Sequence, residues 1–289
     1  MMVMISSVQA QDATPTSSAS SNAYVVNLST SPSIVEAKKP FTLTVTILNA
    51  GGKTPVTAFD EVHTKLLHFI VVSQDLTQFL HIHPDYQGGG VFVLKDLVLP
   101  DSANYVTYAD FTPTGDQQHY VRNTLTVNGA TDKQPNLAVS PREITVGDLK
   151  ITLEGEDVFA AGVETSLKFH VSDAKTNADV DNLDEYLGAA GHLVIIDEAN
   201  QIYIHTHPAG HDMADMGGMS GMSTATPEMA GMVMPMNYGP DLEFVTEIPS
   251  AGLWGMWLQT QYKGDVYTFP FVVKVTDNGD ATPEAHAHG

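Results

Sequence analysis

The chain has 289 residues, enough for two ordinary domains, and it combines 43% hydrophobic with only 16% charged residues. A formal net charge of −21 argues against nucleic acid or an anionic membrane as a partner and favours the attraction of cations. The chain has no cysteine, which excludes disulfides, thiolate metal sites, iron–sulfur clusters and thiol catalysis. Any site for a soft metal must therefore use histidine and methionine.

The N-terminal residues predict export. Residues 1–10 (MMVMISSVQA) are interpreted as the remnant of a secretory signal peptide, because a short apolar run precedes the small-x-Ala pattern Val8-Gln9-Ala10. Residues 11–23 are polar and are expected to form a linker. No apolar stretch in the sequence has the length of a transmembrane segment. We therefore expect a secreted, periplasmic or cell-envelope protein.

The rest of the chain predicts an all-β fold of two tandem immunoglobulin-like β-sandwich domains, with one large barrel as the less favoured alternative. Short runs rich in β-branched and aromatic residues alternate with Gly, Pro, Asn and Asp. The first domain (24–129) has such runs at 24–30, 41–48, 66–72, 79–83, 91–99, 104–111 and 121–127. A linker (130–147) precedes the second domain (148–277), with runs at 149–154, 165–173, 192–197, 201–207, 242–248, 253–262 and 267–275, and a flexible tail (278–289) follows.

An internal repeat is the strongest signal in the sequence. Residues 68–84 (HFIVVSQDLTQFLHIHP) and 192–208 (HLVIIDEANQIYIHTHP) share the pattern His-x12-His-x-His-Pro. Chance repetition of this pattern in one chain is very improbable. The repeat indicates that each domain carries the same arrangement of histidines.

Strand pairing places these histidines together. A hairpin of 66–73 and 76–83 around a two-residue turn at Gln74-Asp75 would set His68 opposite His81, with His83 on the same face. The same pairing in the second copy would set His192 opposite His205, beside His207. Three imidazoles on one face suit copper, zinc or nickel.

Other uses of His-x-His lack required parts. A cupin-type enzyme needs a glutamate shortly after the pair, and neither 84–88 nor 208–212 contains one. A copper–zinc superoxide dismutase needs a disulfide and further zinc ligands, and a blue-copper site needs cysteine. The sequence therefore predicts metal binding without catalysis. The alternative that stays open is a structural module whose histidines only brace strands.

The second half carries an insertion, residues 209–240, in place of the short first-half loop. Its Gly, Ser and Pro content predicts a mobile loop, and thioether sulfur prefers Cu(I) or Ag(I). The alternative is an adhesive apolar surface. The candidate ligands are His211 at its entrance and Met213, Met216, Met219, Met222, Met229, Met232, Met234 and Met236.

Residues 63–86, followed by 105–115, resemble exported histidine-rich bacterial proteins found alongside copper-handling genes. Residues 183–208 and 239–275 resemble that family's Tyr-Leu-Gly-Ala-x-Gly-His and Gly-Pro-x-x-x-Phe segments. The chain departs from the family at Thr64, where an acidic residue is usual, and at Val245, where a histidine is. The resemblance implies immunoglobulin-like domains, copper or another heavy metal, and the ligands His63, His68, His81, His83, His192, His205 and His207.

Together these features predict an extracytoplasmic protein that binds copper, with zinc or silver as alternatives, for sequestration, trafficking or resistance. The expected partners are metal ions and other copper-handling envelope proteins, and self-association is left open. The competing prediction is a structural envelope or extracellular module. Whether the two clusters form two sites or one shared site is not decided by the sequence.

Overall fold

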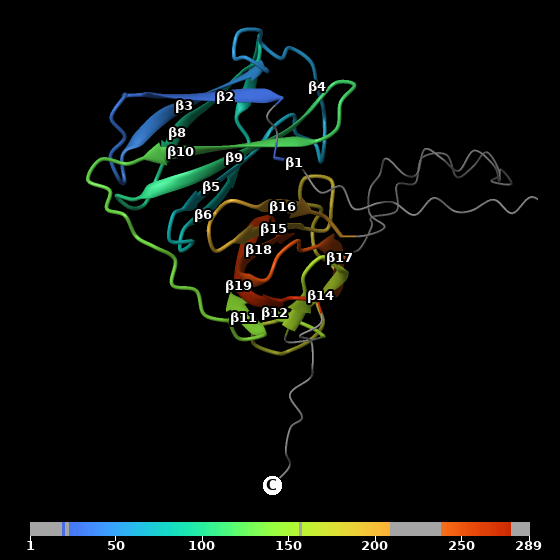
Figure 1. The fold of residues 1–289 in the computed structure, drawn as a ribbon. Helices are drawn as coiled ribbons and strands as arrows, with labels where there is room; N and C mark the ends of the chain where they lie inside the picture. Colours follow the sequence, from blue (N-terminus) through green and yellow to red (C-terminus); the bar gives the residue numbers. More distant parts are fainter. Residues whose placement is uncertain (1–18, 21–22, 156–157, 209–237, 279–289) are drawn as a thin grey trace, which may run out of the picture.

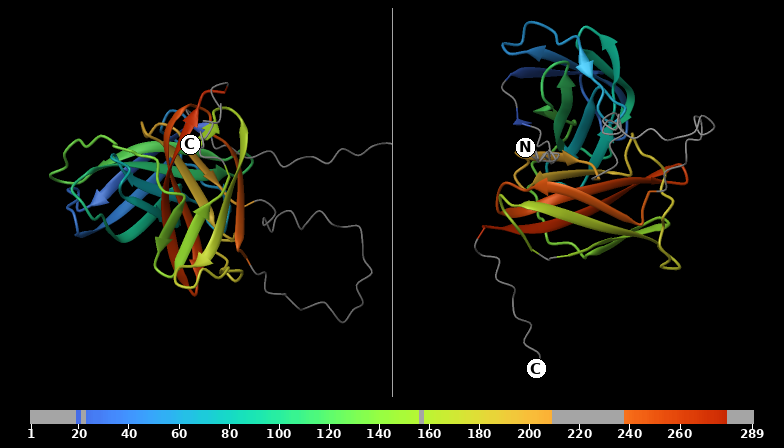
Figure 2. Two further views of the ribbon diagram at one scale, coloured as in Figure 1. Left: turned by 90° about the horizontal axis from the view of Figure 1, so that it is seen from below. Right: turned by 90° about the vertical axis from the view of Figure 1, so that its right-hand side faces the viewer.

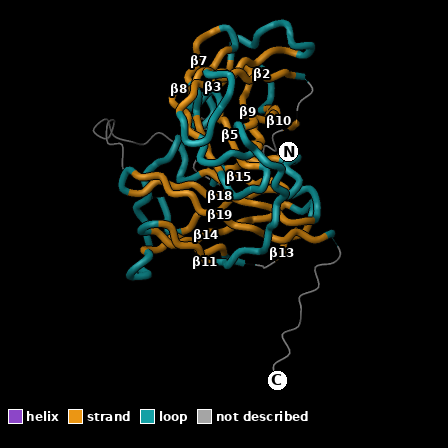
Figure 3. The backbone as a smooth tube through the Cα atoms, turned by 90° about the vertical axis from the view of Figure 1, so that its left-hand side faces the viewer, coloured by secondary structure: helices purple, strands orange, loops and turns teal. Residues whose placement is uncertain are grey.

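The computed structural model describes residues 19–20, 23–155, 158–208 and 238–278, and within them it contains strands and loops but no helix (Figures 1 and 3). The strands form two β-sandwiches that follow one another along the chain (Figure 1). The predicted fold class, two tandem immunoglobulin-like β-sandwiches, is confirmed.

The first sandwich packs a sheet in the order β1-β10-β9-β5-β6, with β4 beside β9, against a sheet in the order β2-β3-β8-β7. Alternate residues such as Leu43, Val45, Phe69 and Phe92 fill the core between the sheets. The strands are β1 (Ala19–Ser20), β2 (Tyr24–Ser31), β3 (Pro40–Asn49), β4 (Phe59–Asp60), β5 (His68–Ser73), β6 (Phe79–Ile82), β7 (Asp85–Gly88), β8 (Val91–Val98), β9 (Asn104–Pro113) and β10 (His119–Thr126).

The second sandwich packs a sheet in the order β11-β12-β14-β17 against one in the order β13-β19-β18-β15-β16. Phe169, Phe244, Trp254 and Phe271 lie in its core. The strand β11 lies inside the stretch expected to be a linker. The strands are β11 (Glu143–Val146), β12 (Leu149–Leu153), β13 (Val158–Ala160), β14 (Glu164–Asp173), β15 (His192–Asp197), β16 (Tyr203–Thr206), β17 (Asp241–Glu247), β18 (Gly252–Tyr262) and β19 (Asp265–Thr276).

The repeated strands β5 and β15 are buried on both faces. One face of each points into its own sandwich, as Phe69 and Leu193 do. The other face packs against the neighbouring domain, where Ile70 and Val72 share an apolar cluster with Val194 and Ile196. The sheets that carry the repeat therefore form the interface between the two domains (Figure 2).

The contacts across this interface are reciprocal. Phe79 stacks on Trp257 with ring centroids 4.9 Å apart, and Tyr203 stacks on Tyr108 with centroids 4.8 Å apart. Phe79 and Tyr203 are equivalent in the two repeats, and Tyr108 and Trp257 each pair with the third residue of the repeated strand. The domains thus pack about an approximate two-fold axis, with the same surface used on both sides.

The predicted register of both hairpins is wrong by two residues. His81 pairs with Ile70 instead of His68, and His205 pairs with Val194 instead of His192. The turn is longer than two residues because the Asp75 carboxylate accepts hydrogen bonds from the Ser73 hydroxyl and the Thr77 amide. A shift of two residues leaves every side chain on its original face, so the predicted histidine face is retained.

Candidate metal centre

The first triad brings together three histidine nitrogens from β5 and the end of the β6 hairpin. His68 Nδ1 lies 3.0 Å from His81 Nε2 and 3.2 Å from His83 Nε2, and the two Nε2 atoms are 3.1 Å apart. His68 is buried, and His81 and His83 are half-buried. The three nitrogens form a nearly equilateral triangle.

The second triad repeats this arrangement with the same ring atoms. His192 Nδ1 lies 3.2 Å from His205 Nε2 and 2.9 Å from His207 Nε2. His192 and His205 are buried and His207 is half-buried. Each sandwich therefore presents one Nδ1 and two Nε2 atoms to a common point.

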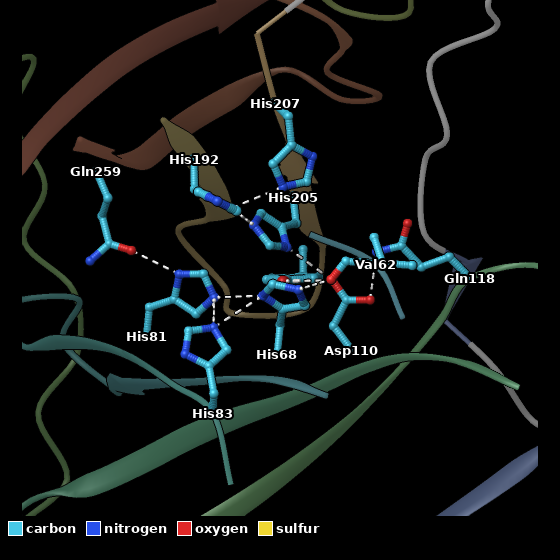
Figure 4. A network of polar contacts seen from close by, with 11 residues as sticks. Val62, His68, His81, His83, Asp110, Gln118, His192, His205, His207 and Gln259 are labelled. Atoms are coloured by element: carbon cyan, nitrogen blue, oxygen red, sulfur yellow. Dashed lines mark hydrogen bonds and ion pairs between the residues drawn. The ribbon is translucent and has the colours of Figure 1, made fainter. Parts of the chain in front are cut away.

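The two triads meet at the interface (Figure 4). The rings of His68 and His205 are 5.1 Å apart between centroids, and those of His81 and His205 are 5.2 Å apart. Ligand atoms of these three histidines lie within 4.8 Å of one another. The question of one location or two is answered by this packing, because all six histidines lie in one centre built by both domains.

His63 reaches from the first domain to the second triad. Its ring stacks on His207 with centroids 3.4 Å apart. His63 and Thr64 occupy a tight turn with φ values of 46° and 63°, and Leu187 and Gly188 occupy the equivalent turn with 53° and 78°. The repeat thus kept the turn, while only the first domain places a histidine in it.

These two turns also orient the first histidine of each triad. The Nε2–H of His68 donates to the carbonyl of Val62, and the Nε2–H of His192 donates to that of Tyr186, both at 3.0 Å. Because a carbonyl can only accept, the proton of each ring lies on Nε2 and the lone pair on Nδ1 faces the centre. Outer hydrogen bonds of this kind are typical of metal-ligating histidines.

The middle histidine of each triad is oriented by the opposite domain. His81 Nδ1–H donates to the Gln259 side-chain oxygen at 2.8 Å, and His205 Nδ1–H donates to Asp110 Oδ2 at 3.2 Å (Figure 4). The Tyr203 hydroxyl also donates to Asp110 Oδ2, at 3.0 Å. Each triad therefore depends on a residue that only domain docking brings into place.

Burial keeps the six triad imidazoles uncharged. Desolvation lowers the pKa of His68, His81, His192 and His207 well below the ordinary value of 6.5, and lowers the pKa of His83 and His205 to about 3. Repulsion between neighbouring imidazolium charges acts in the same direction. Burial raises the pKa of Asp110, while the nearby His68 and hydrogen bonds from Gln118 and Tyr203 oppose that rise.

These donors fit a transition metal. An ion bound at about 2.0–2.1 Å separates its nitrogen ligands by about 2.9 Å at right angles and about 3.3 Å in a tetrahedron. The separations observed within the triads run from 2.9 to 3.2 Å. Neutral imidazoles need not release a proton to bind, and imidazole suits copper, zinc and nickel. In four of the six rings, those of His68, His81, His192 and His205, the outer hydrogen bond leaves the inner nitrogen with its lone pair.

Seven predicted residues are brought together here, His63, His68, His81, His83, His192, His205 and His207. His211 and the eight methionines at 213, 216, 219, 222, 229, 232, 234 and 236 lie outside the described residues, as does the signal-peptide remnant. The sequence prediction missed Asp110 and Gln259. Both residues lie in strands that the sequence predicted. In the structure they occupy equivalent places there, because Asp110 pairs with His68 and Gln259 pairs with His192.

The chain belongs to the family described as Domain of unknown function (DUF8832), which matches residues 19–129 and 144–277. The two matched segments cover the two sandwiches. No curated protein matches the chain. Among the residues that the structure describes, no helix is long and apolar enough to cross a membrane.

Several solved adhesin structures are similar to the chain. The Escherichia coli adhesin FdeC shows 13% identity and a TM-score of 0.25, covering 87% of this chain and 64% of its own. A tetra-tandem repeat of a large adhesion protein shows 8% identity and a TM-score of 0.28, and the match covers 88% of this chain and 49% of that protein's chain. A 1.5-MDa bacterial ice-binding adhesin shows 11% identity and a TM-score of 0.23, and the match covers 88% of this chain and 65% of that protein's chain. The chain spans less than two thirds of each, and scores this low carry no argument about function.

Proposed function

We propose that this protein binds transition-metal ions in the histidine centre between its two domains, outside the cytoplasm. The observation that supports the proposal is the pair of nitrogen triads. In both, Nδ1 of the first histidine lies 2.9–3.2 Å from the Nε2 atoms of the other two. Outer hydrogen bonds turn the lone pairs of four of these rings inward, those of His68, His81, His192 and His205. A protein with histidines that only brace strands has no need to bring three ring nitrogens to one point.

Copper is the proposed physiological metal and zinc the second candidate. Copper(II) binds nitrogen sites more tightly than the other divalent first-row metals do. The net charge of −21 favours cations in general and does not select among them. The methionine-rich stretch 209–240 supports Cu(I) or Ag(I) by its composition alone, which fits a role in sequestration, trafficking or resistance.

We propose a binding role without catalysis. Asp110, the carboxylate beside the triads, is buried and already accepts hydrogen bonds from Gln118, Tyr203 and His205. A general base needs a free lone pair within reach of a substrate. Asp110 is therefore placed to orient a ligand.

The second candidate function is a structural module of the envelope or the extracellular space. The observation that favours it is the apolar interface, in which Val72 and Val106 of one domain pack with Ile196 and Trp257 of the other. Such an interface holds the domains together by burial alone. In this role the histidines would serve only as hydrogen-bond partners.

Replacing His81 and His83 together by alanine separates the two functions. Titration of the full chain with Cu²⁺ and Zn²⁺ should show fewer bound ions in this variant than in the original protein. Metal should also raise the melting temperature of the original protein in proportion to the logarithm of free metal. His170→Ala is the control, because His170 lies between Asp179 and Asp241, away from the centre. Unchanged stoichiometry in the double variant would contradict the metal-binding proposal.

A further inference from the structure

We infer that the two triads are unequal positions of one dinuclear metal centre, and that the triad of the second domain takes the first divalent cation. This inference rests on the proposed function. It adds to that function the number of ions, the order in which they bind and the residue that sets the order.

Two positions follow from the spacing of the nitrogens. The three nitrogens of the first triad lie 3.0–3.2 Å apart. In the second triad His192 Nδ1 lies 3.2 and 2.9 Å from the Nε2 atoms of His205 and His207, and ligands of one ion have such separations. Among these six histidines, no nitrogen of one triad makes a hydrogen-bond contact with a nitrogen of the other. The ligand atoms of His68, His81 and His205 nevertheless lie within 4.8 Å of one another. Each triangle can hold its own ion, and the two ions would be close neighbours.

The support for the triads is reciprocal in position. Asp110 is the cross-strand partner of His68 in the first domain, and it reaches over to His205 of the second. Gln259 is the cross-strand partner of His192 in the second domain, and it reaches back to His81 of the first. Both residues therefore perform the same task from equivalent places about the two-fold axis.

The two residues that orient the middle histidines, Asp110 and Gln259, differ in charge. Asp110 can place a full negative charge on the hydrogen bond to His205, whereas Gln259 offers an amide dipole to His81. A carboxylate partner raises the basicity of a ligating imidazole and offsets the charge of the cation. Asp110 is 1% exposed, so water does not screen this effect. The triad of His192, His205 and His207 is consequently the stronger position for a divalent cation.

The side-chain amide of Gln259 is oriented by a second contact. Its side-chain nitrogen donates to the hydroxyl of Thr268 at 2.9 Å, which fixes its oxygen toward His81. The oxygen Oδ1 of Asp110 accepts from the Gln118 amide at 2.7 Å. If Asp110 is changed to Asn, a flip of the Gln118 amide lets its oxygen accept a hydrogen bond from the new side-chain NH2 group. Asp110 and Gln259 are therefore both suited to a substitution that changes only the charge.

The test is a Zn²⁺ titration of the full chain against a chelating indicator of known affinity. The original protein should bind two ions in two resolved steps. Asp110→Asn should weaken the first step by about 10- to 100-fold, the usual effect of removing such a partner, and leave the second nearly unchanged. Gln259→Glu should tighten the second step and bring the two affinities together. The melting temperature of each variant without metal checks that its fold is kept.

Two further variants assign the steps to positions. His207→Ala should remove the tight step and keep the weak one, and His83→Ala should do the reverse. Loading with Cu²⁺ provides a spectroscopic readout, because two neighbouring Cu²⁺ ions couple magnetically. The electron paramagnetic resonance spectrum should show a half-field transition at two equivalents that is absent at one.

The outcomes separate this inference from the function on which it rests. One ion at saturation, weakened alike by His83→Ala and His207→Ala, would show a single shared ion and overturn the dinuclear centre. Two equal steps that Asp110→Asn leaves unchanged would overturn the proposed order. Two uncoupled Cu²⁺ signals would overturn the close pairing. Binding of no metal by any form would overturn the proposed function as well.

Discussion

The two domains differ most where they contact each other's histidine triads. Both keep a triad with the same ring atoms and a tight turn whose carbonyl orients the first histidine. They differ in the residue that crosses the interface, Asp110 against Gln259, and in the turn, His63 against Leu187. The comparison teaches that a duplicated scaffold can retain identical histidine triads while the residues that orient those histidines differ.

Acid should destabilise the histidine triads of both domains at once, and this is the largest effect that we expect. The native imidazoles have a lowered pKa, so they stay neutral while the unfolded chain takes up protons below its ordinary pKa of about 6.5. Their contribution to the free energy of unfolding is therefore present above pH 6.5 and is lost as pH falls toward about 3, the pKa of His83 and His205.

Urea unfolding of the metal-free protein between pH 8 and pH 5 measures this loss. Stability should fall by several kcal/mol, since one unit of pKa shift corresponds to about 1.4 kcal/mol per group. A variant with all six triad histidines replaced by glutamine should show a much flatter profile. Equal pH dependence of the two proteins would contradict the electrostatic account.

Tyr203→Phe should make the interface more symmetric, because the equivalent residue of the first domain is Phe79. The change removes the hydroxyl that donates to Asp110 Oδ2 at 3.0 Å and keeps the ring stacked on Tyr108. We expect a loss of about 1.5–3 kcal/mol in the free energy of unfolding, the usual worth of a hydrogen bond to a charged group. Chemical denaturation measures it, and Tyr105→Phe, which alters a hydroxyl in the first-domain core, serves as the control. No loss would mean that Asp110 does not need this donor.

His63→Leu should have the smallest effect. Leucine occurs at the equivalent turn position with a similar φ, so the backbone should accept the change. Loss of the stacking on His207 should weaken binding at the second triad about two- to tenfold, since a stacked aromatic pair contributes about 0.5–1.5 kcal/mol. Metal titration with Leu187→Ala as the control measures this change. A loss beyond a hundredfold would instead identify His63 as a direct ligand.

The sequence predicted the features that depend on local pattern. Runs rich in β-branched and aromatic residues located the main strands, and the repeated spacing placed the three histidines of each copy on one face. The sequence did not predict the register of the hairpins correctly, because side chains such as Asp75 close a turn longer than two residues. An error of two residues did no harm, since alternation preserves the face.

Docking of the domains could not be derived from local pattern, because the contacts join residues far apart in sequence, such as His81 with Gln259 and His205 with Asp110. One signal did point to it. The runs Phe69–Val72 and Leu193–Ile196 lack the polar residues of a strand with a solvated face, which is typical of strands buried on both sides. The missed residues Asp110 and Gln259 lie on the neighbouring strands of those runs.

The most direct test of the metal centre is the metal content of the full chain after equilibrium dialysis against Zn²⁺ or Cu²⁺. Its comparison is a variant that carries both His83→Ala and His207→Ala, which removes one ligand from each triad. The account predicts two ions per original chain, and a melting temperature that rises with free metal only in the original protein. Equal metal content and equal melting behaviour in the two proteins would contradict it.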